Sequence, residues 1–322
     1  MIAREPTHRP MVLQTEDLAP EPSAWLAERA ELVRAAYDEP AFGVRLPLAE
    51  AMVVRTYTTI DDEILGCAPK LRVIGRAGVG LDNIDVAACR ARGVEVVHTP
   101  DANTRAVVEF VLAVLLDAVR PRVFLDRALT PVMWTDTRRE LIAERELSER
   151  RLGVYGLGRV GSQVARAAAA LDVEVVYHDL REIPEAQTFG AKRVGREELL
   201  ATSDVLSVHV DGRSSNRGLL GVDAFGRMKS DVLFLNTSRG FVVDAAALAE
   251  HMINHPAAQA VLDVHDPEPF DRTYPLLDIA NVHLTPHIAS ATARAKTAMS
   301  WVVRDVWRVL QGEAPKFPAP SE

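Results

Sequence analysis

The sequence predicts an α/β protein made of two doubly wound domains with parallel sheets. Short apolar runs of strand length alternate with helical stretches along most of the chain, a pattern typical of parallel sheets covered by helices. The chain has 322 residues, which exceeds the size at which one hydrophobic core tends to divide into two. The alternation also falls into two series, and the second begins at Arg151.

The first series predicts four strands, three short helices and one long helix. The strands are expected at Met11–Gln14, Ala51–Thr56, Leu71–Arg76 and Val94–His98. The helices are expected at Ser23–Tyr37, at Ile60–Cys67 with Thr59 as its cap, at Asp85–Arg92 closed by Gly93, and at Thr104–Arg120. Pro121 should stop the long helix, because proline cannot continue one.

The second series predicts six strands, of which Val173–Tyr177 is rich in β-branched residues. They are expected at Arg151–Tyr155, Val173–Tyr177, Asp204–Val210, Asp231–Thr237, Gln259–Val264 and Val282–Leu284. Helices are expected after the first strand and at Glu197–Ala201, Ala224–Met228, Asp244–Asn254 and Ser290–Leu310. The last of these is amphipathic and precedes a proline-rich tail.

The composition excludes several classes of protein. The formal net charge is −8 and no basic tract occurs, so binding to nucleic acid is not expected. Cys67 and Cys89 form no metal-ligand pattern and suggest a reduced, cytoplasmic compartment. The longest apolar stretch, Val107–Val119, contains Glu109 and Asp117 and is too short to span a membrane. The first ten residues do not resemble a signal peptide.

A glycine motif opens the second series. Gly156, Gly158 and Gly161 follow a predicted strand and precede a predicted helix, and Asp179 ends the next strand. These glycines would allow a tight turn, close approach of a pyrophosphate and close packing of the helix on the strand. The helix N-terminus would attract the phosphates, and the acid would suit the ribose of NAD. The alternative is an ordinary βαβ unit whose glycines serve packing only.

Charged residues follow two later strands of the second series. Arg239 lies just beyond a strand, at the edge where open α/β sheets bind ligands. An arginine there can bind a carboxylate through two parallel hydrogen bonds, although a solvent-exposed loop arginine is an equal alternative. Asp263, Asp266 and Glu268 follow the next strand, and any one of them could be a surface acid.

Two histidines, His283 and His287, follow in the last strand region. An intervening proline excludes a helical pair that faces one metal ion. An extended segment would hold them about 13 Å apart, so no metal site is expected. A loop histidine is often structural, but histidine is also the natural acid–base group near neutral pH.

Six segments then occur in a recognisable order and spacing. They are APKLRVIGRAGVGLDNIDV, TPDANTRAVVEFVL, VYGLGRVG, LNTSRGFVVDAAAL, LDVHDPEP and NVHLTPHIASAT. Together they resemble the D-isomer-specific 2-hydroxyacid dehydrogenases, especially the D-3-phosphoglycerate dehydrogenase-like branch. The resemblance covers most of the chain, from about Ala51 to Leu310. It implies a NAD-binding Rossmann domain at residues 101–289, inserted into a flavodoxin-like substrate-binding domain formed by residues 1–100 and 290–322.

The resemblance also implies an activity: transfer of hydride between the nicotinamide of NAD and C2 of a D-2-hydroxy acid or 2-oxo acid. His287 would exchange the proton, Glu268 would hold and stabilise the charged imidazole, and Arg239 would bind the substrate carboxylate. The implied cofactor contacts are Gly156, Gly158, Arg159, Val160, Gly161, Asp179, His209, Thr237, Ser238, Arg239, Asp263, His287, Ala289 and Ser290. The implied substrate contacts are Arg55, Arg76, Ala77, Gly78, Val79 and Gly80.

Some positions depart from the family pattern. The usual proline after "HV" is Asp211, the usual phenylalanine in "DVF" is His265, and a basic position after Trp134 reads Asp136. No C-terminal regulatory domain is expected after residue 320. The substrate therefore stays open among 3-phosphoglycerate, hydroxypyruvate and glyoxylate or related acids.

Two alternatives to such an enzyme are a non-enzymatic NAD(H)-responsive protein of the corepressor type and the formate dehydrogenase branch. Glu268 disfavours the latter, which carries glutamine there. The resemblance further implies a homodimer, for which the Val107–Val119 helix and the segment near Trp134 are the candidate interface.

Overall fold

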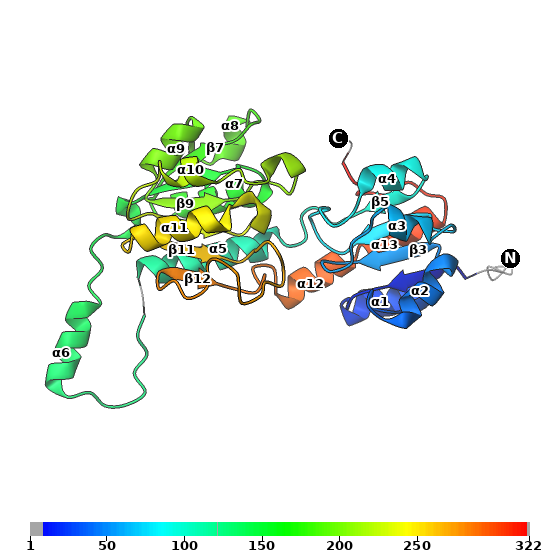
Figure 1. Cartoon of the computed structure of the whole chain (residues 1–322), viewed down its shortest axis with the longest axis horizontal. Coiled ribbons are helices and arrows are strands. Elements are labelled where there is room, and N and C mark those ends of the chain that lie inside the picture. The colour runs from blue at the N-terminus through cyan, green and yellow to red at the C-terminus, as the bar shows by residue number, and fades with distance from the viewer. Residues whose placement is uncertain (1–8, 121, 321–322) are drawn as a thin grey trace. The chain divides into compact units, whose positions relative to one another are not determined.

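The computed structural model describes residues 9–120 and 122–320. The chain folds into two compact units, one formed by Met1–Asn103 with Ala291–Glu322 and the other by Thr104–Ser290. Each unit contains one sheet whose paired strands all run parallel (Figure 1). The predicted fold class, two doubly wound α/β domains, is therefore confirmed.

The first unit has a five-stranded sheet in the order β2-β1-β3-β4-β5, which is the flavodoxin-like order. Its strands are β1 (Met11–Gln14), β2 (Glu31–Arg34), β3 (Ala51–Val54), β4 (Val73–Arg76) and β5 (Glu95–Val97). Its helices are α1 (Pro20–Ala27), α2 (Pro40–Arg45), α3 (Asp62–Gly66), α4 (Val86–Ala91), α12 (Ala293–Ser300) and α13 (Val303–Leu310), with a 3-10 turn η1 (Leu46–Leu48).

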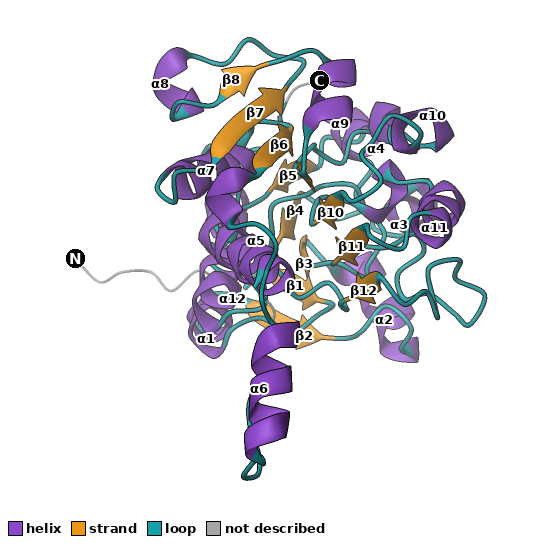
Figure 2. Ribbon diagram, turned by 90° about the vertical axis from the view of Figure 1, so that its left-hand side faces the viewer, coloured by secondary structure: helices purple, strands orange, loops and turns teal. Residues whose placement is uncertain are grey.

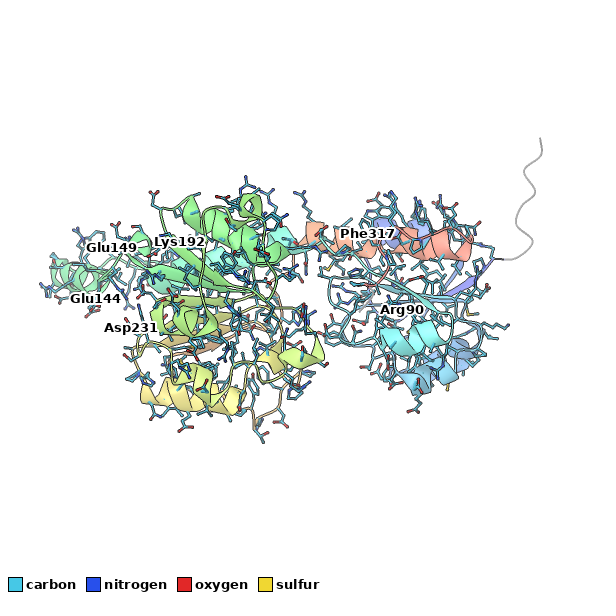
Figure 3. The ribbon with its side chains drawn as sticks, turned by 90° about the horizontal axis from the view of Figure 1, so that it is seen from above. Arg90, Glu144, Glu149, Lys192, Asp231 and Phe317 are labelled. Carbon is cyan, nitrogen blue, oxygen red and sulfur yellow. The ribbon has the colours of Figure 1, made fainter. Side chains whose placement is uncertain are left out.

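The C-terminal segment belongs to the core of this first unit. Val302, Val303 and Val306 are buried in one cluster with Val12 and Val73 of the sheet. The chain then returns across the unit, where Phe317 donates its backbone N–H to Asp305 and Arg90 donates to the Ala319 carbonyl oxygen (Figure 3 labels Phe317 and Arg90). The first unit is therefore discontinuous in sequence because α13 supplies apolar residues that its sheet needs.

The second unit has a seven-stranded sheet in the order β12-β11-β10-β9-β6-β7-β8, a Rossmann order extended by one strand. Its strands are β6 (Arg151–Tyr155), β7 (Glu174–His178), β8 (Lys192–Arg193), β9 (Val205–Val208), β10 (Leu233–Asn236), β11 (Gln259–Leu262) and β12 (Val282–Leu284). Its helices are α5 (Thr104–Val119), α6 (Pro131–Glu140), α7 (Arg159–Ala169), α8 (Glu185–Thr188), α9 (Arg196–Thr202), α10 (Val222–Phe225) and α11 (Ala245–Asn254). Three 3-10 turns are η2 (Leu147–Glu149), η3 (Ser214–Asn216) and η4 (Gly240–Val242).

Two hydrophobic cores cover the two faces of this sheet. Within β10, Leu233 and Leu235 join the core shared with α5 and α7, whereas Phe234 joins the core shared with α9, α10 and α11. Successive side chains of a strand point to opposite faces, so a buried parallel strand is apolar throughout. Figure 2 shows α5 and α7 on one side of the sheet and α9, α10 and α11 on the other.

Several predicted boundaries were wrong. The predicted helix Ser23–Tyr37 ends as α1 at Ala27, and Glu31–Arg34 within the remainder forms β2, which pairs with β1. Pairing with a distant strand overrides local helix preference here. The predicted final helix is two helices, α12 and α13, because hydrogen bonds between residues three apart interrupt it near Val302.

Other local predictions also need correction. The cap of α3 is Asp61, whose side chain accepts from the Ile64 N–H, and not Thr59. The sequence prediction missed α2, α6 and α8. The start of α6 had a recognisable signal, since Thr130 caps it and Pro131 occupies its first turn. The predicted stop at Pro121 lies outside the described residues.

The segment that carries α6 projects from the seven-stranded unit (Figure 1). None of the α6 residues is buried. At the returning end of the segment, Arg145 is 3.1 Å from Asp204 and 3.2 Å from Asp231 (Figure 3 labels Asp231). Across residues 9–120 and 122–320, no helix combines the length and apolar character needed to cross a bilayer.

Candidate functional site

The glycine motif forms the turn between β6 and α7. Gly156 has a φ of +94°, and a Cβ there would lie 2.9 Å from the backbone of His209 at the end of β9. A side chain is therefore excluded both by backbone conformation and by the neighbouring strand. Gly158 is the N-cap of α7, so the first backbone N–H groups of this helix face the turn, as an anion site requires.

Asp179 lies at the carboxyl end of β7 and is only 8% exposed. Its carboxylate accepts from the Leu157 N–H of the glycine turn at 2.8 Å and from the backbone and guanidinium of Arg181. Burial raises the pKa of Asp179, but these hydrogen bonds and the Arg181 charge outweigh burial and lower the pKa below its usual value. The acid therefore stays ionised at neutral pH and also fixes the glycine turn.

His209 follows β9, and its Nε2 lies 2.9 Å from the Ser207 hydroxyl. Although the residue is partly exposed, protein atoms surround its ring and this desolvation lowers its pKa to about 4. The ring is therefore neutral at physiological pH. A histidine that stays neutral can line a binding site, but it is poorly suited to acid–base catalysis near neutral pH.

The turn after β10 contains Arg239 and is organised by a buried asparagine. Asn236 is fully buried, accepts from the backbone and hydroxyl of Ser238, and donates to the Arg239 carbonyl oxygen. Arg239 Nη1 donates to the Ser238 carbonyl oxygen at 2.7 Å. The Thr237 hydroxyl is buried and has no hydrogen-bond partner among the described residues. Sequence reasoning did not single out Asn236.

His287 and Glu268 form a direct pair. His287 Nδ1 lies 2.7 Å from Glu268 Oε2, and the other carboxylate oxygen accepts from the His265 backbone N–H at 2.7 Å. Burial raises the pKa of Glu268, but the hydrogen bonds from His287 and His265 outweigh it, so the pKa is lowered. The structure thus joins two residues that the sequence placed in separate loops.

Gly240 brings the turn after β10 against the loop that carries Glu268. A Cβ at Gly240 would lie 1.9 Å from the His265 carbonyl carbon, far inside van der Waals contact, and the backbone atom it meets could not simply rotate away. No larger residue can therefore hold Arg239 and the Glu268 loop in this arrangement. The only sequence signal for Gly240 was its place beside Arg239.

Asp263 organises the segment around His287. It is 1% exposed, and its carboxylate accepts from the Thr285 hydroxyl and from the backbone N–H groups of Ile288 and Ala289. Its carboxylate thus holds the two ends of the segment that contains His287. Its contact with the nicotinamide side stays a prediction.

The predicted substrate contacts lie in the first unit, at the carboxyl ends of neighbouring strands. Arg76 ends β4 and pairs in register with Val54, the last residue of β3. Arg55 directly follows Val54 in the chain. Arg55 Nη1 donates to the Asp17 carbonyl oxygen at 3.1 Å, and Glu16 accepts the Arg55 backbone N–H at 2.9 Å. The Val79 carbonyl oxygen lies 2.9 Å from His98 Nδ1. Sequence reasoning missed Glu16, whose carboxylate holds this loop.

The site contains no cluster that suits a metal. Within the described part of the chain, no three His, Cys, Asp or Glu side chains come together in a way that could hold an ion. The geometry instead offers a carboxylate–imidazole pair, an arginine and a glycine turn, all at carboxyl ends of strands in the second unit. This combination can bind a phosphorylated cofactor and move a proton.

Comparisons with known proteins identify the family. Residues 112–289 match the family described as "D-isomer specific 2-hydroxyacid dehydrogenase, NAD binding domain". A D-3-phosphoglycerate dehydrogenase of Archaeoglobus fulgidus is 40% identical over 269 residues, 83% of this chain and 50% of that protein. A glyoxylate reductase of Aeropyrum pernix is 33% identical over 317 residues, 95% of each chain.

A solved structure also covers nearly the whole chain. The D-lactate dehydrogenase of Aquifex aeolicus, complexed with NAD and lactic acid, has a TM-score of 0.80 and 26% identity, and the match covers 94% of this chain and 96% of that one. The chain spans about half the length of the phosphoglycerate dehydrogenases it matches. It therefore belongs to the D-isomer specific 2-hydroxyacid dehydrogenase family, and its second unit contains the family's NAD-binding domain.

Proposed function

We propose that this protein is a NAD-dependent oxidoreductase that interconverts a D-2-hydroxy acid and the corresponding 2-oxo acid. The observation that carries the proposal is the 2.7 Å contact between His287 Nδ1 and Glu268 Oε2. Membership of a dehydrogenase family supports it. No contact in the described residues favours the alternative of a non-enzymatic NAD(H)-responsive protein. Measured turnover of a 2-oxo acid would exclude that alternative.

The residues of the second unit fit NAD. The glycine turn offers helix N–H groups to a pyrophosphate, and Asp179 stands at the strand end where an acid binds the ribose hydroxyls. The buried Thr237 hydroxyl, which lacks a partner in the described residues, gives the cofactor a further polar contact. NAD, when bound, supplies the hydride acceptor or donor. We assign the remaining predicted cofactor contacts to the same site.

The acid–base role follows from the orientation of the pair. Glu268 is ionised and can only accept, so His287 Nδ1 carries a proton and donates it to the carboxylate. Nε2 is then the atom that can exchange a proton with the substrate oxygen. The Glu268 charge stabilises the imidazolium form that reduction needs. Arg239, held by Asn236, would bind the substrate carboxylate and polarise the carbonyl group.

The substrate class is tested with a panel of 2-oxo acids. Glyoxylate, hydroxypyruvate and 3-phosphohydroxypyruvate are each incubated with NADH, and the loss of nicotinamide absorbance is followed. If Arg55 and Arg76 bind a substrate phosphate, Arg55→Ala should raise the KM for the phosphorylated acid by about 10- to 150-fold, the effect of one hydrogen bond to a charged group. The KM for glyoxylate should hardly change.

The matched control is Arg45→Ala, an exposed arginine on α2 of the same unit. Equal effects of Arg55→Ala on both substrates would place Arg55 outside a phosphate site. Failure of every 2-oxo acid to support turnover, with NADH bound, would contradict the dehydrogenase proposal itself.

We expect Asp179 and Arg181 to act in opposite directions on cofactor choice. Asp179→Ala removes the charge that repels the 2′-phosphate of NADPH, so the preference for NADH should weaken. Arg181 partly neutralises that charge and is 64% exposed, so Arg181→Ala should strengthen the preference by up to about fivefold, the range of an exposed ion pair. The measurement is kcat/KM for both cofactors. A shift of both variants in the same direction would contradict these roles.

We also propose that the protein is a homodimer in the cytoplasm. The projecting segment that carries α6 exposes large apolar side chains, including Phe124 at 84%, Val132 at 69% and Trp134 at 49%, and such exposure is typical of interfaces. Cys67 and Cys89 are both free thiols, in keeping with a reducing compartment.

Sedimentation velocity at micromolar concentration should show a dimer that Trp134→Asp weakens. Ile253→Asp is the control, because Ile253 is 65% exposed on α11, away from this segment. A monomeric wild-type protein would contradict the dimer.

A further inference from the structure

His265 contacts Glu268 of the proton-transfer pair and also the Thr285 carbonyl group, which accepts the His287 N–H. The residue follows β11 and is only 6% exposed. Its ring packs edge-on against Phe270 and Tyr274, with centroid distances of 4.8 and 5.5 Å. Both of its ring nitrogens also have polar partners, so packing alone does not describe what this side chain does.

The partners of the ring define its tautomer. Nε2 lies 2.9 Å from the Thr285 carbonyl oxygen, which can only accept, so Nε2 carries the proton. Nδ1 lies 3.3 Å from the Tyr274 hydroxyl. Burial, and then the charges of Asp266 and Glu268, raise the pKa of Tyr274 to about 12. The tyrosine therefore keeps its proton and can donate it to Nδ1.

The Thr285 carbonyl oxygen connects this ring to His287. The same oxygen accepts the backbone N–H of His287 at 3.0 Å. His287 has a φ of +53°, in the left-handed region that residues other than glycine rarely adopt. Such a conformation persists only where surrounding contacts hold it. The ring of His265 is one of those contacts, because it fixes the carbonyl group that closes the turn.

The backbone of His265 meets the other member of the pair. Its N–H donates to Glu268 Oε1 at 2.7 Å, while Oε2 of the same carboxylate faces His287 Nδ1. The carbonyl side of His265 lies against Gly240. His265 thus orients the Glu268 carboxylate through its backbone N–H, and its ring supports the turn that carries His287.

We propose that His265 is a positioning residue, whose Nε2–H holds the Thr285 carbonyl group and so keeps His287 in line with Glu268. The inference rests on the proposed function, in which His287 and Glu268 transfer the proton. His265 itself does not exchange a proton with the substrate. The competing explanation is that the ring only fills space between Phe270 and Tyr274.

Two substitutions separate these explanations. His265→Phe keeps the planar ring and its packing but removes the Nε2–H donor. His265→Gln loses the ring but places an amide N–H near the position of Nε2. If the hydrogen bond matters, kcat for 2-oxo acid reduction should fall about tenfold in the Phe variant, the scale of one lost hydrogen bond, and should largely recover in the Gln variant. The KM for NADH should stay within about twofold, since the glycine turn and Asp179 are unchanged.

A second readout does not depend on turnover. The proton on His287 Nδ1, hydrogen-bonded to a carboxylate, should give a strongly downfield resonance in NMR spectra of the wild-type protein. This resonance should broaden or move upfield in His265→Phe and persist in His265→Gln. Thermal unfolding of each variant confirms that it is folded, and His265→Met replaces the Phe variant if the latter does not fold.

The outcomes are distinct. A Phe variant with wild-type kcat and an unchanged His287 resonance, or one that outperforms the Gln variant, overturns the positioning role and leaves ring packing. If the wild-type protein reduces no 2-oxo acid, the proposed function fails, but the NMR comparison still decides whether His265 positions His287.

Discussion

His287→Ala is expected to lower the rate of 2-oxo acid reduction by about 100- to 10,000-fold, the usual contribution of a general acid–base group. The substitution removes Nε2, the atom proposed to deliver the proton. NADH affinity should change little, because the proposed contacts of the cofactor phosphates and ribose lie at the glycine turn and Asp179. The measurement is kcat with the best 2-oxo acid, together with NADH binding followed by fluorescence.

Two further variants make the His287 result specific. His283→Ala is the matched control, because His283 is exposed on β12 in the same segment, and it should retain near-wild-type turnover. His287→Asn tolerates the left-handed backbone better than alanine does and can still donate to Glu268, yet it should remain inactive because it lacks Nε2. Near-wild-type turnover in His287→Ala would refute the mechanism.

Glu268→Gln is expected to move the alkaline limb of the reduction rate to lower pH. The variant keeps the shape of the side chain but loses the charge that stabilises protonated His287. A hydrogen bond to a charged group is worth about 1.5–3 kcal/mol, so the rate at alkaline pH should fall by about 10- to 150-fold.

The sign of this pH effect follows from the state of Glu268. Its pKa is lowered, since the hydrogen bonds from His287 and His265 outweigh burial, so the stabilising charge is present above that pKa and throughout the neutral and alkaline range. Reduction requires protonated His287, and the loss in the variant should be partly recovered as pH falls. The test is the rate of reduction against pH for the wild type and for Glu268→Gln.

Asp266→Asn is the control for Glu268→Gln. Asp266 lies in the same loop and is 45% exposed, but it pairs with Arg217 at 2.7 Å and not with His287. The alkaline limb of the reduction rate should shift much less in Asp266→Asn than in Glu268→Gln. An alkaline limb of Glu268→Gln that is unshifted, or shifted to higher pH, would contradict the coupling between the two residues.

The alternation of strands and helices could be read from the sequence because it depends on local signals. β1, β6 and β12 have the predicted bounds, since each is a short and mostly apolar run. The family, and with it the NAD-binding domain, was also recognisable, because its motifs lie in short continuous segments. A buried parallel strand and a glycine turn each carry their pattern within a few neighbouring residues.

Elements that depend on distant partners could not be read in the same way. β2 continues a helical pattern in sequence and becomes a strand only because β1 offers it an edge. α6 has no buried face, so it lacks the periodicity by which helices are usually recognised. The split between α12 and α13 falls near Val302, where hydrogen bonds between residues three apart replace the helical pattern, and no helix-breaking residue marks it.

The sequence by itself determined the two-domain α/β class, the family and the residue types available for chemistry, because these are written in local patterns and ordered motifs. Only the tertiary structure decided which of these residues meet. In it, Glu268 contacts His287, Gly240 lies against the His265 backbone, and the His265 ring contacts the Thr285 carbonyl oxygen. Parallel strands bring their carboxyl ends to one edge of a sheet, and contacts made there link residues far apart in sequence that no local pattern connects.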